Sequence, residues 1–247
     1  MFFWDEQPRT GEGKKKGSYI HHSTIEDNPI KEVRDQYLEK LEDLDDATML
    51  QIYRHGIWAL PTGIIFNWDT AEMPPENPDE IFYGLDFGYS VDPTAVIRIY
   101  RKADEFWVEE MVYEAKLTNQ DLGNKMKSLG MNGNEAIYAD SAEPKSIQEL
   151  YEMGFNIKPS EKGPDSVRAG IDYLKSKKIH VLTNSQFIIA ERSSYKWKQD
   201  KDGRDLPIPV DFKNHAMDAI RYGIFTHCKR QMGGFAIPDA GVGDIWT

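Results

Sequence analysis

The stretch IFYGLDFGYSVDPTAVIRIYRKADEFWVEEMVY, residues 81–113, decides the fold class. It contains three runs rich in apolar and β-branched residues, at 81–87, 95–100 and 106–113. The short polar connection Lys102-Ala-Asp-Glu105 joins the last two runs. Runs of this kind, interrupted by Gly, Pro and Asp, are typical of strands. We therefore predict three consecutive strands with a hairpin between the second and the third.

Beyond residue 113 the pattern alternates between helices and strands. The predicted helices are 119–129, 144–153 and 164–177, and the predicted strands are 136–140, 155–159 and 179–182. Strands that alternate with helices are typical of crossover units, which add parallel strands to a sheet. We expect an α/β domain over residues 81–228, with a mixed central sheet flanked by helices.

The remaining residues divide into three segments. Residues 1–18 are polar and rich in Gly and Lys, and we expect them to be flexible. Residues 19–80 read as an acidic helical linker, in which apolar residues recur at helical spacing over 33–53. Residues 229–247 are rich in Gly and lack periodicity, so we expect a flexible tail.

The composition indicates a soluble intracellular protein. No apolar run approaches the roughly 20 residues of a membrane span, and the N-terminal residues lack the basic flank of a signal peptide. Cys228 is the single cysteine, so an internal disulfide is impossible and a reducing compartment fits. No membrane partner is expected.

The formal net charge of −11 argues against a DNA partner until its distribution is considered. Residues 1–80 hold 8 Lys and Arg against 17 Asp and Glu, a net of −9, so residues 81–247 hold 22 against 24, a net of −2. The predicted domain is therefore nearly neutral, and local basic clusters within it are able to contact phosphates.

Three aspartates stand where a strand ends or a helix turns inward. Asp86 ends the first predicted strand, Asp140 ends the strand at 136–140, and Asp218 neighbours the apolar residues of a later helical stretch. Buried carboxylates are costly, and converging ones repel each other unless a divalent cation joins them. Oxygen ligands suit Mg²⁺ or Mn²⁺. The pattern predicts a carboxylate metal site.

Asp92 and His215 are auxiliary candidates for this site. Asp92 lies six residues after Asp86, and a turn before Pro93 is its ordinary explanation. His215 lies on the same helical side as Asp218, where hydrogen bonding to a carboxylate is the simpler role. Asp140 also has a second interpretation, because it stands just before a helix that it could cap.

Several phrases, in one order, carry a family resemblance. They are Ser18-Tyr-Ile-His-His-Ser-Thr-Ile-Glu-Asp-Asn-Pro29, Gly84-Leu-Asp-Phe-Gly-Tyr-Ser-Val-Asp-Pro-Thr-Ala95, Tyr138-Ala-Asp-Ser-Ala-Glu-Pro144, Lys162-Gly-Pro-Asp-Ser-Val-Arg-Ala-Gly-Ile171 and Asn214-His-Ala-Met-Asp-Ala-Ile-Arg-Tyr222. From Ile81 to about Thr226 the chain resembles the C-terminal nuclease domain of the large terminase subunit of tailed bacteriophages. The resemblance implies a ribonuclease H-like fold that cuts double-stranded DNA with two metal ions held by Asp86, Asp140 and Asp218.

The same resemblance implies the partners. They are double-stranded DNA, the N-terminal ATPase domain of the subunit, the portal protein and the small terminase subunit, in the cytoplasm of a host bacterium. No G-x-x-x-x-G-K-[ST] phosphate loop occurs in this chain, so we expect the ATPase domain to lie on another part of a longer subunit.

Basic residues in a predicted hairpin at about 195–210 are candidates for DNA contact. The candidates are Arg192, Lys196, Lys198, Lys201 and Arg204, together with Lys162 beside a predicted helix start. A solvated surface is the ordinary interpretation of such a cluster. For the family, the hairpin is a mobile element beside the catalytic cleft.

Two other functions remain open from the sequence. The phrase around Asp86 also resembles the first phosphate-binding motif of actin-like ATPases and sugar kinases, which would make the chain an ATP-dependent phosphotransferase. A DNA-gripping or portal-docking module without catalysis is the alternative that is not an enzyme.

Overall fold

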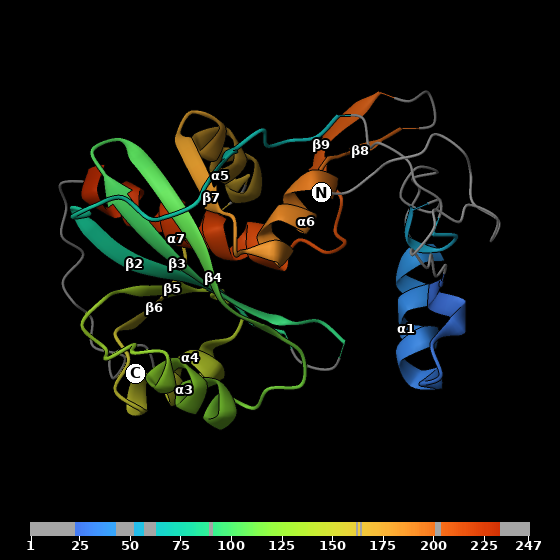
Figure 1. Cartoon of the computed structure of the whole chain (residues 1–247), viewed down its shortest axis with the longest axis horizontal. Coiled ribbons are helices and arrows are strands. Elements are labelled where there is room, and N and C mark those ends of the chain that lie inside the picture. Colours follow the sequence, from blue (N-terminus) through green and yellow to red (C-terminus); the bar gives the residue numbers. More distant parts are fainter. Residues whose placement is uncertain are drawn as a thin grey trace, which may run out of the picture. The chain divides into compact units, whose positions relative to one another are not determined.

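The structure is a computed structural model, and Figure 1 shows its fold. It describes residues 23–42, 52–56, 63–88, 91–161, 163, 165–200 and 204–232. The predicted flexible segment 1–18 lies outside these residues. No helix in the described part of the chain is long and apolar enough to cross a membrane.

One seven-stranded mixed sheet organises the larger part of the described chain. In sheet order its strands are β1 (Asp69–Ala71), β7 (Lys178–Leu182), β4 (Glu105–Glu114), β3 (Thr94–Lys102), β2 (Glu80–Asp86), β5 (Ile137–Ala139) and β6 (Ile157–Pro159). Strands β2, β3 and β4 form the expected antiparallel meander, and the other pairings are parallel. The prediction of a mixed α/β sheet is confirmed.

Helices cover both faces of this sheet (Figure 1). On one face, α3 (Asn119–Ser128) and α4 (Pro144–Glu152) pack on an apolar cluster that includes Leu85 and Ala139. On the other face lie α5 (Ser166–Lys175), α6 (Gln186–Ser194) and α7 (His215–Met232). Because side chains alternate along a strand, the residues next to Leu85 and Ala139 point toward the face that α7 covers.

A glycine contact brings α7 close to the centre of the sheet. A Cβ atom on Gly84 of β2 would lie 1.8 Å from the carbonyl oxygen of Ala219, and one on Gly223 would lie 3.2 Å from the Gly84 Cα. Only residues without a side chain allow the backbones of β2 and α7 to approach this closely. The contact places the first turns of α7 over the end of β2.

The described residues form two compact units, and their boundary differs from our prediction. The unit that contains the sheet begins at Ile64, whereas we expected the domain to begin at residue 81. Two interactions account for this earlier start: β1 pairs with β7, and Phe66 stacks on Trp68 and Tyr195. Residues 64–71 therefore contribute to the sheet unit.

The end of the described chain also differs from the expected tail at 229–247. Helix α7 continues to Met232 because its last turn is held by polar contacts. Gln231 donates to Glu80 and accepts from Arg101, and Arg230 donates to the carbonyl of Pro159. Residues 233–247 lie outside the described part.

The second unit combines an N-terminal segment with a hairpin. Its elements are η1 (Ile25–Asp27), α1 (Lys31–Glu42), β8 (Trp197–Gln199) and β9 (Asp205–Pro209). Strands β8 and β9 pair antiparallel where we predicted a hairpin. Leu41, Val210 and Phe212 form its apolar cluster.

Candidate active site

Asp86 and Asp140 lie side by side at the ends of two neighbouring strands. Strands β2 and β5 are parallel, with Leu85 opposite Ala139, and the amide of Asp140 donates to the carbonyl of Leu85 over 3.2 Å. Continued alternation directs both carboxylates toward the face that carries α7. Asp86 is buried, with 8% of its surface exposed.

Helix α7 brings Asp218 to the same place. Its next residue, Ala219, is the one that contacts Gly84, two residues before Asp86. A further sign of proximity comes from Tyr222, whose pKa is raised by burial and then by the negative charges of Asp218, Asp86 and Asp140. The three acids that the sequence singled out therefore lie near enough to act on one another electrostatically.

The negative charges act on one another. Burial raises the pKa of Asp86 to about 6; the hydrogen bond from His215 opposes this shift, and the charges of Asp218 and Asp140 reinforce it. Such mutual repulsion is the property expected of carboxylates that share a cation.

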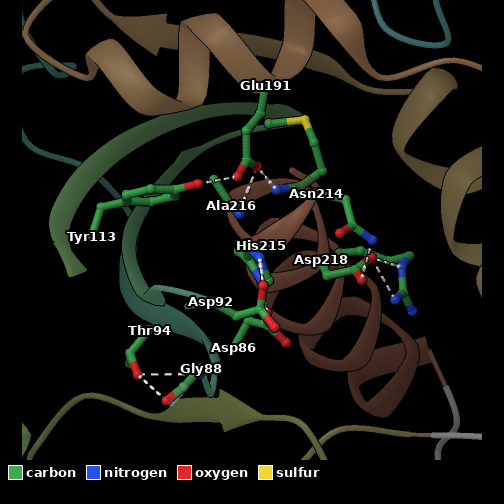
Figure 2. Close-up of polar contacts among 12 residues, drawn as sticks. Asp86, Gly88, Asp92, Thr94, Tyr113, Glu191, Asn214, His215, Ala216 and Asp218 are labelled. Carbon is green, nitrogen blue, oxygen red and sulfur yellow. Dashed lines mark hydrogen bonds and ion pairs between the residues drawn. The ribbon is translucent and has the colours of Figure 1, made fainter. Parts of the chain in front are cut away.

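His215 bridges two acids, as Figure 2 shows. Its Nδ1 lies 3.0 Å from Oδ2 of Asp86, and its Nε2 lies 3.5 Å from Oδ1 of Asp92. Burial disfavours the imidazolium, but the hydrogen bonds that it donates to Asp86 and Asp92 outweigh burial and raise the pKa of His215 to about 10. The histidine thus carries positive charge at neutral pH and contacts a carboxylate, although that carboxylate is Asp86 and not Asp218.

Asp218 has cationic and neutral donors of its own. Arg221 donates to Oδ1 from Nε over 3.2 Å and from Nη2 over 2.8 Å, and the Asn214 amide donates to Oδ2 over 3.1 Å (Figure 2). Arg221 is 6% exposed and passes Gly170 of α5, where a Cβ would lie 2.8 Å from its Cγ and Cδ. This buried ion pair fixes the side chain of Asp218 along the surface of its own helix, α7.

Asp140 also takes part in the turn before α4, close to the capping role that was its second interpretation. Its Oδ1 accepts a hydrogen bond from the amide of Ala142 over 2.9 Å, which closes a turn before α4. The cap position of α4 is taken by Glu143 and not by Asp140. Turn formation and a place beside Asp86 are therefore compatible.

A divalent metal fits this donor set by its chemistry. Three carboxylates lie near enough to act on one another, the pKa of Asp86 is raised by burial and then by the charges of Asp218 and Asp140, and hard cations prefer oxygen ligands. In the arrangement of the described residues, no group of three His, Cys, Asp or Glu is close enough to hold a metal ion. Two of the three acids are instead held by His215 and Arg221.

The predicted DNA-contact residues are only partly at the surface. Lys196 is 2% exposed, and Arg192 is half-buried and donates to the carbonyl of Trp68. This corrects the expectation of one exposed basic cluster, because Lys196 is buried and Arg192 is half-buried. Lys198 and Arg204 are exposed on the hairpin unit, and Lys162 and Lys201 lie outside the described residues.

Two residues of this site were missed from the sequence. Arg221 stands three residues after Asp218, and this spacing on a helix was a usable signal of an ion pair. Glu191 lies in α6, a helix that we did not predict, and it reaches α7 across 25 residues of sequence. No local pattern indicates such a contact.

The order of the strands and the three acids on one face define a ribonuclease H-like fold with an acidic centre. Residues 86–225 match the family model described as the Terminase RNAseH like domain. This match covers more than half of the chain, and the protein belongs to that family. The resemblance drawn from the sequence is confirmed.

Relatives support the same assignment. The chain is 32% identical over 244 residues to the large terminase subunit of Bacillus phage SPP1, covering 89% of this chain and 54% of that protein. It is 26% identical over 226 residues to the PBSX phage terminase large subunit of Bacillus subtilis strain 168, covering 85% and 51%. The chain spans about half the length of the curated relatives it matches.

Solved structures share the fold. The nuclease domain of the SPP1 large terminase, crystallised with bound Mn, superposes with a TM-score of 0.54 at 32% identity, covering 58% of this chain and 84% of that one. The nuclease domain of the P22 large terminase superposes with a TM-score of 0.53 at 18% identity, covering 69% and 95%. The second likeness bears on the fold alone.

Proposed function

We propose that the chain is a divalent-metal-dependent DNA endonuclease, the part of a phage terminase large subunit that cleaves concatemeric double-stranded DNA during genome packaging. The observation that carries the proposal is the convergence of Asp86, Asp140 and Asp218 on one face of the sheet. Family membership and the Mn-bound relative support it.

In this proposal Asp86, Asp140 and Asp218 hold two ions, Mg²⁺ or Mn²⁺. Such ions would supply a water molecule of lowered pKa for attack on the phosphodiester and positive charge to stabilise the leaving oxygen. The residues of the chain position the ligands. His215 orients Asp86, Asp92 orients His215, and Arg221 orients Asp218 until a cation takes over part of the neutralisation.

The partners are proposals as well, and they rest on the family resemblance drawn from the sequence. The chain would act on double-stranded DNA, beside the ATPase domain of its own subunit, and with the portal protein and the small terminase subunit. It would work in the cytoplasm of the host bacterium. The family assignment argues against the actin-like phosphotransferase, and a DNA-gripping or portal-docking role without cleavage remains the alternative to test.

Plasmid digestion tests this function. We expect the purified chain to cut supercoiled plasmid with Mg²⁺ or Mn²⁺ and not with chelator, and we expect Asp86→Asn, Asp140→Asn and Asp218→Asn each to abolish cutting. Asn keeps the size of the side chain, so circular dichroism should show a folded domain in each variant. DNA binding without cutting at any metal concentration would favour the gripping module, and tight ATP binding would favour the phosphotransferase.

A further inference from the structure

Glu191 is a buried carboxylate that the chemistry above does not use. It is 3% exposed and lies near the end of α6. Its Oε2 accepts hydrogen bonds from the amides of Ala216 over 2.7 Å and Met217 over 3.2 Å, and its Oε1 accepts one from the hydroxyl of Tyr113 over 2.5 Å (Figure 2). Burial raises the pKa of Glu191 to about 7, so burying it in ionised form is costly.

These contacts place Glu191 at the start of the helix that carries Asp218. The first amides of an α-helix have no partner within the helix, and a carboxylate beside them also complements the helix dipole. The residue before α7, Asn214, directs its amide to Asp218. The backbone amides of Ala216 and Met217, in the first turn of α7, donate instead to the side chain of Glu191 from α6.

Tyr113 connects Glu191 to the sheet row that contains Asp86. Asp86 of β2 pairs with Ala95 of β3, and Ala95 pairs with Tyr113 of β4. Residues paired across strands share one face of a sheet, so Tyr113 and Asp86 point to the same side. These contacts form a closed chain of interactions. From the sheet row of Asp86, Tyr113 bonds to Glu191, and Glu191 bonds to the first turn of α7. His215 of that turn contacts Asp86 again.

We propose that Glu191 is a positioning residue of the active site, which fixes the first turn of α7 and thereby sets where His215 and Asp218 lie relative to Asp86. The inference rests on the proposed nuclease function for its kinetic consequences. Its structural part, the hold on the Ala216 and Met217 amides, stands independently of that function.

The test compares Glu191→Gln with a matched control in the full chain. Glu110 is the control, because its carboxylate is partly buried and, like that of Glu191, accepts a hydrogen bond from a helix amide, in this case that of Phe187 in α6. Circular dichroism defines a temperature at which each variant is fully folded. At that temperature we measure kcat, the KM for plasmid, and the Mn²⁺ concentration that gives half-maximal cleavage.

We expect Glu191→Gln to lower kcat and raise the required Mn²⁺ by about 10- to 100-fold, as is typical when a residue that supports a metal ligand is removed. The KM for plasmid should stay unchanged, Glu191→Asp should recover part of the activity, and Glu110→Gln should match wild type. A Glu191→Gln enzyme with wild-type kcat and metal requirement would overturn the proposal, and so would an equal loss in Glu110→Gln.

Tyr113→Phe decides the case if Glu191→Gln does not fold. It removes only the hydroxyl and keeps the ring, which stacks on Phe187 at 4.3 Å. We expect kcat to fall and the Mn²⁺ requirement to rise, as in Glu191→Gln but by smaller factors. Unchanged kinetics would count against the proposal.

Amide exchange separates this inference from the nuclease function. If wild type does not cut DNA, the function fails while the positioning role is still measured. Exchange of the Ala216 and Met217 amides should be faster in Glu191→Gln than in wild type or Glu110→Gln, and equal exchange in all three proteins would contradict the role.

Discussion

Arg221 and His215 place positive charge against two of the three candidate ligands, and a divalent cation would perform the same task. The Arg221 guanidinium is 7% exposed and its partner carboxylate on Asp218 is 19% exposed. Breaking a buried pair by removing one partner leaves an uncompensated charge. The electrostatic balance at Asp218 therefore depends on either the guanidinium or a bound metal.

Arg221→Met tests this balance. In chelator we expect the free energy of unfolding to fall by about 3 to 5 kcal/mol, because Asp218 stays buried without the guanidinium. Saturating Mn²⁺ should recover more stability in Arg221→Met than it adds to wild type, since the metal neutralises the carboxylate that Arg221 no longer balances. Urea denaturation with and without Mn²⁺ measures both. An equal gain in the two proteins would mean that the ions bind away from Asp218.

Glu191 gives the domain a pH-dependent stability. Its pKa is raised from an ordinary 4.5 to about 7, chiefly by burial, so the folded chain binds this proton more tightly than the unfolded chain does. The contribution of this group to the free energy of unfolding is therefore fully present below pH 4.5. It is lost as pH rises to about 7, a change of about 3 kcal/mol.

Glu191→Gln has no proton to lose at this position. Between pH 4.5 and 8, urea midpoints in chelator should fall less steeply for the variant than for wild type. Parallel curves would show that Glu191 titrates at its ordinary pKa in the folded domain.

At the scale of elements, the contact between β2 and α7 holds the site together. In Gly84→Ala the new methyl would meet the backbone of Ala219 at 1.8 Å, so α7 must move away from the sheet. We expect a loss of about 3 kcal/mol or more, at the upper end of the usual cost of overpacking, and a higher Mn²⁺ requirement for cleavage.

Gly123→Ala is the control for this substitution. Its methyl would meet the terminal methyl of Met153 at 2.1 Å, a flexible group that is able to move. Ala also favours the helix over Gly, so stability should stay within about 1 kcal/mol of wild type. If Gly84→Ala proved as mild as Gly123→Ala, the close approach of β2 and α7 would not be what positions Asp218.

Six of the seven strands of the sheet could be predicted from sequence, and β1 could not. Strands β2, β3 and β4 have seven or more residues each and are rich in apolar and β-branched types, so their pattern is clear. Strand β1 has three residues and gains its pairing only from β7, which is more than a hundred residues away. Helix α6 was missed, although it carries Glu191.

The acids of the site were predictable for a related reason. Asp86 and Asp140 stand at strand ends and Asp218 stands beside the apolar residues of a helix, so the position of each is visible in the local pattern. Their partners depend on tertiary contacts: His215 meets Asp86 across 129 residues, and Glu191 meets Ala216 across 25. Burial of Lys196 was equally invisible, because its neighbours Trp197 and Lys198 suggested a surface cluster.

For the whole molecule, charge limits how DNA is held. With residues 81–247 at a net charge of −2, few phosphates can be neutralised, and binding should be weak and sensitive to salt. Lys198 and Arg204 are the described candidates with exposed side chains. Contacts to phosphate carry no base information, so the hairpin should affect all sequences alike.

Lys198→Ala combined with Arg204→Ala tests the hairpin. We expect slower cutting of every plasmid, a salt slope reduced by about 0.9 for each phosphate that the hairpin no longer neutralises, and unchanged stabilisation by Mn²⁺. Lys127→Ala with Lys145→Ala removes the same charge from exposed positions on α3 and α4, on the face of the sheet opposite to α7, and should leave the rate near wild type. Equal rates for both double variants across a salt series would exclude a special role for the hairpin.

The position of Asp218 on α7 has a consequence during translation. A ribosome makes Asp86 and Asp140 early, but the third acid emerges only with the C-terminal helix of the described chain. That helix must then pack over Gly84 before the carboxylates can meet. Under the proposed function, a nascent chain interrupted before α7 would lack its third metal ligand.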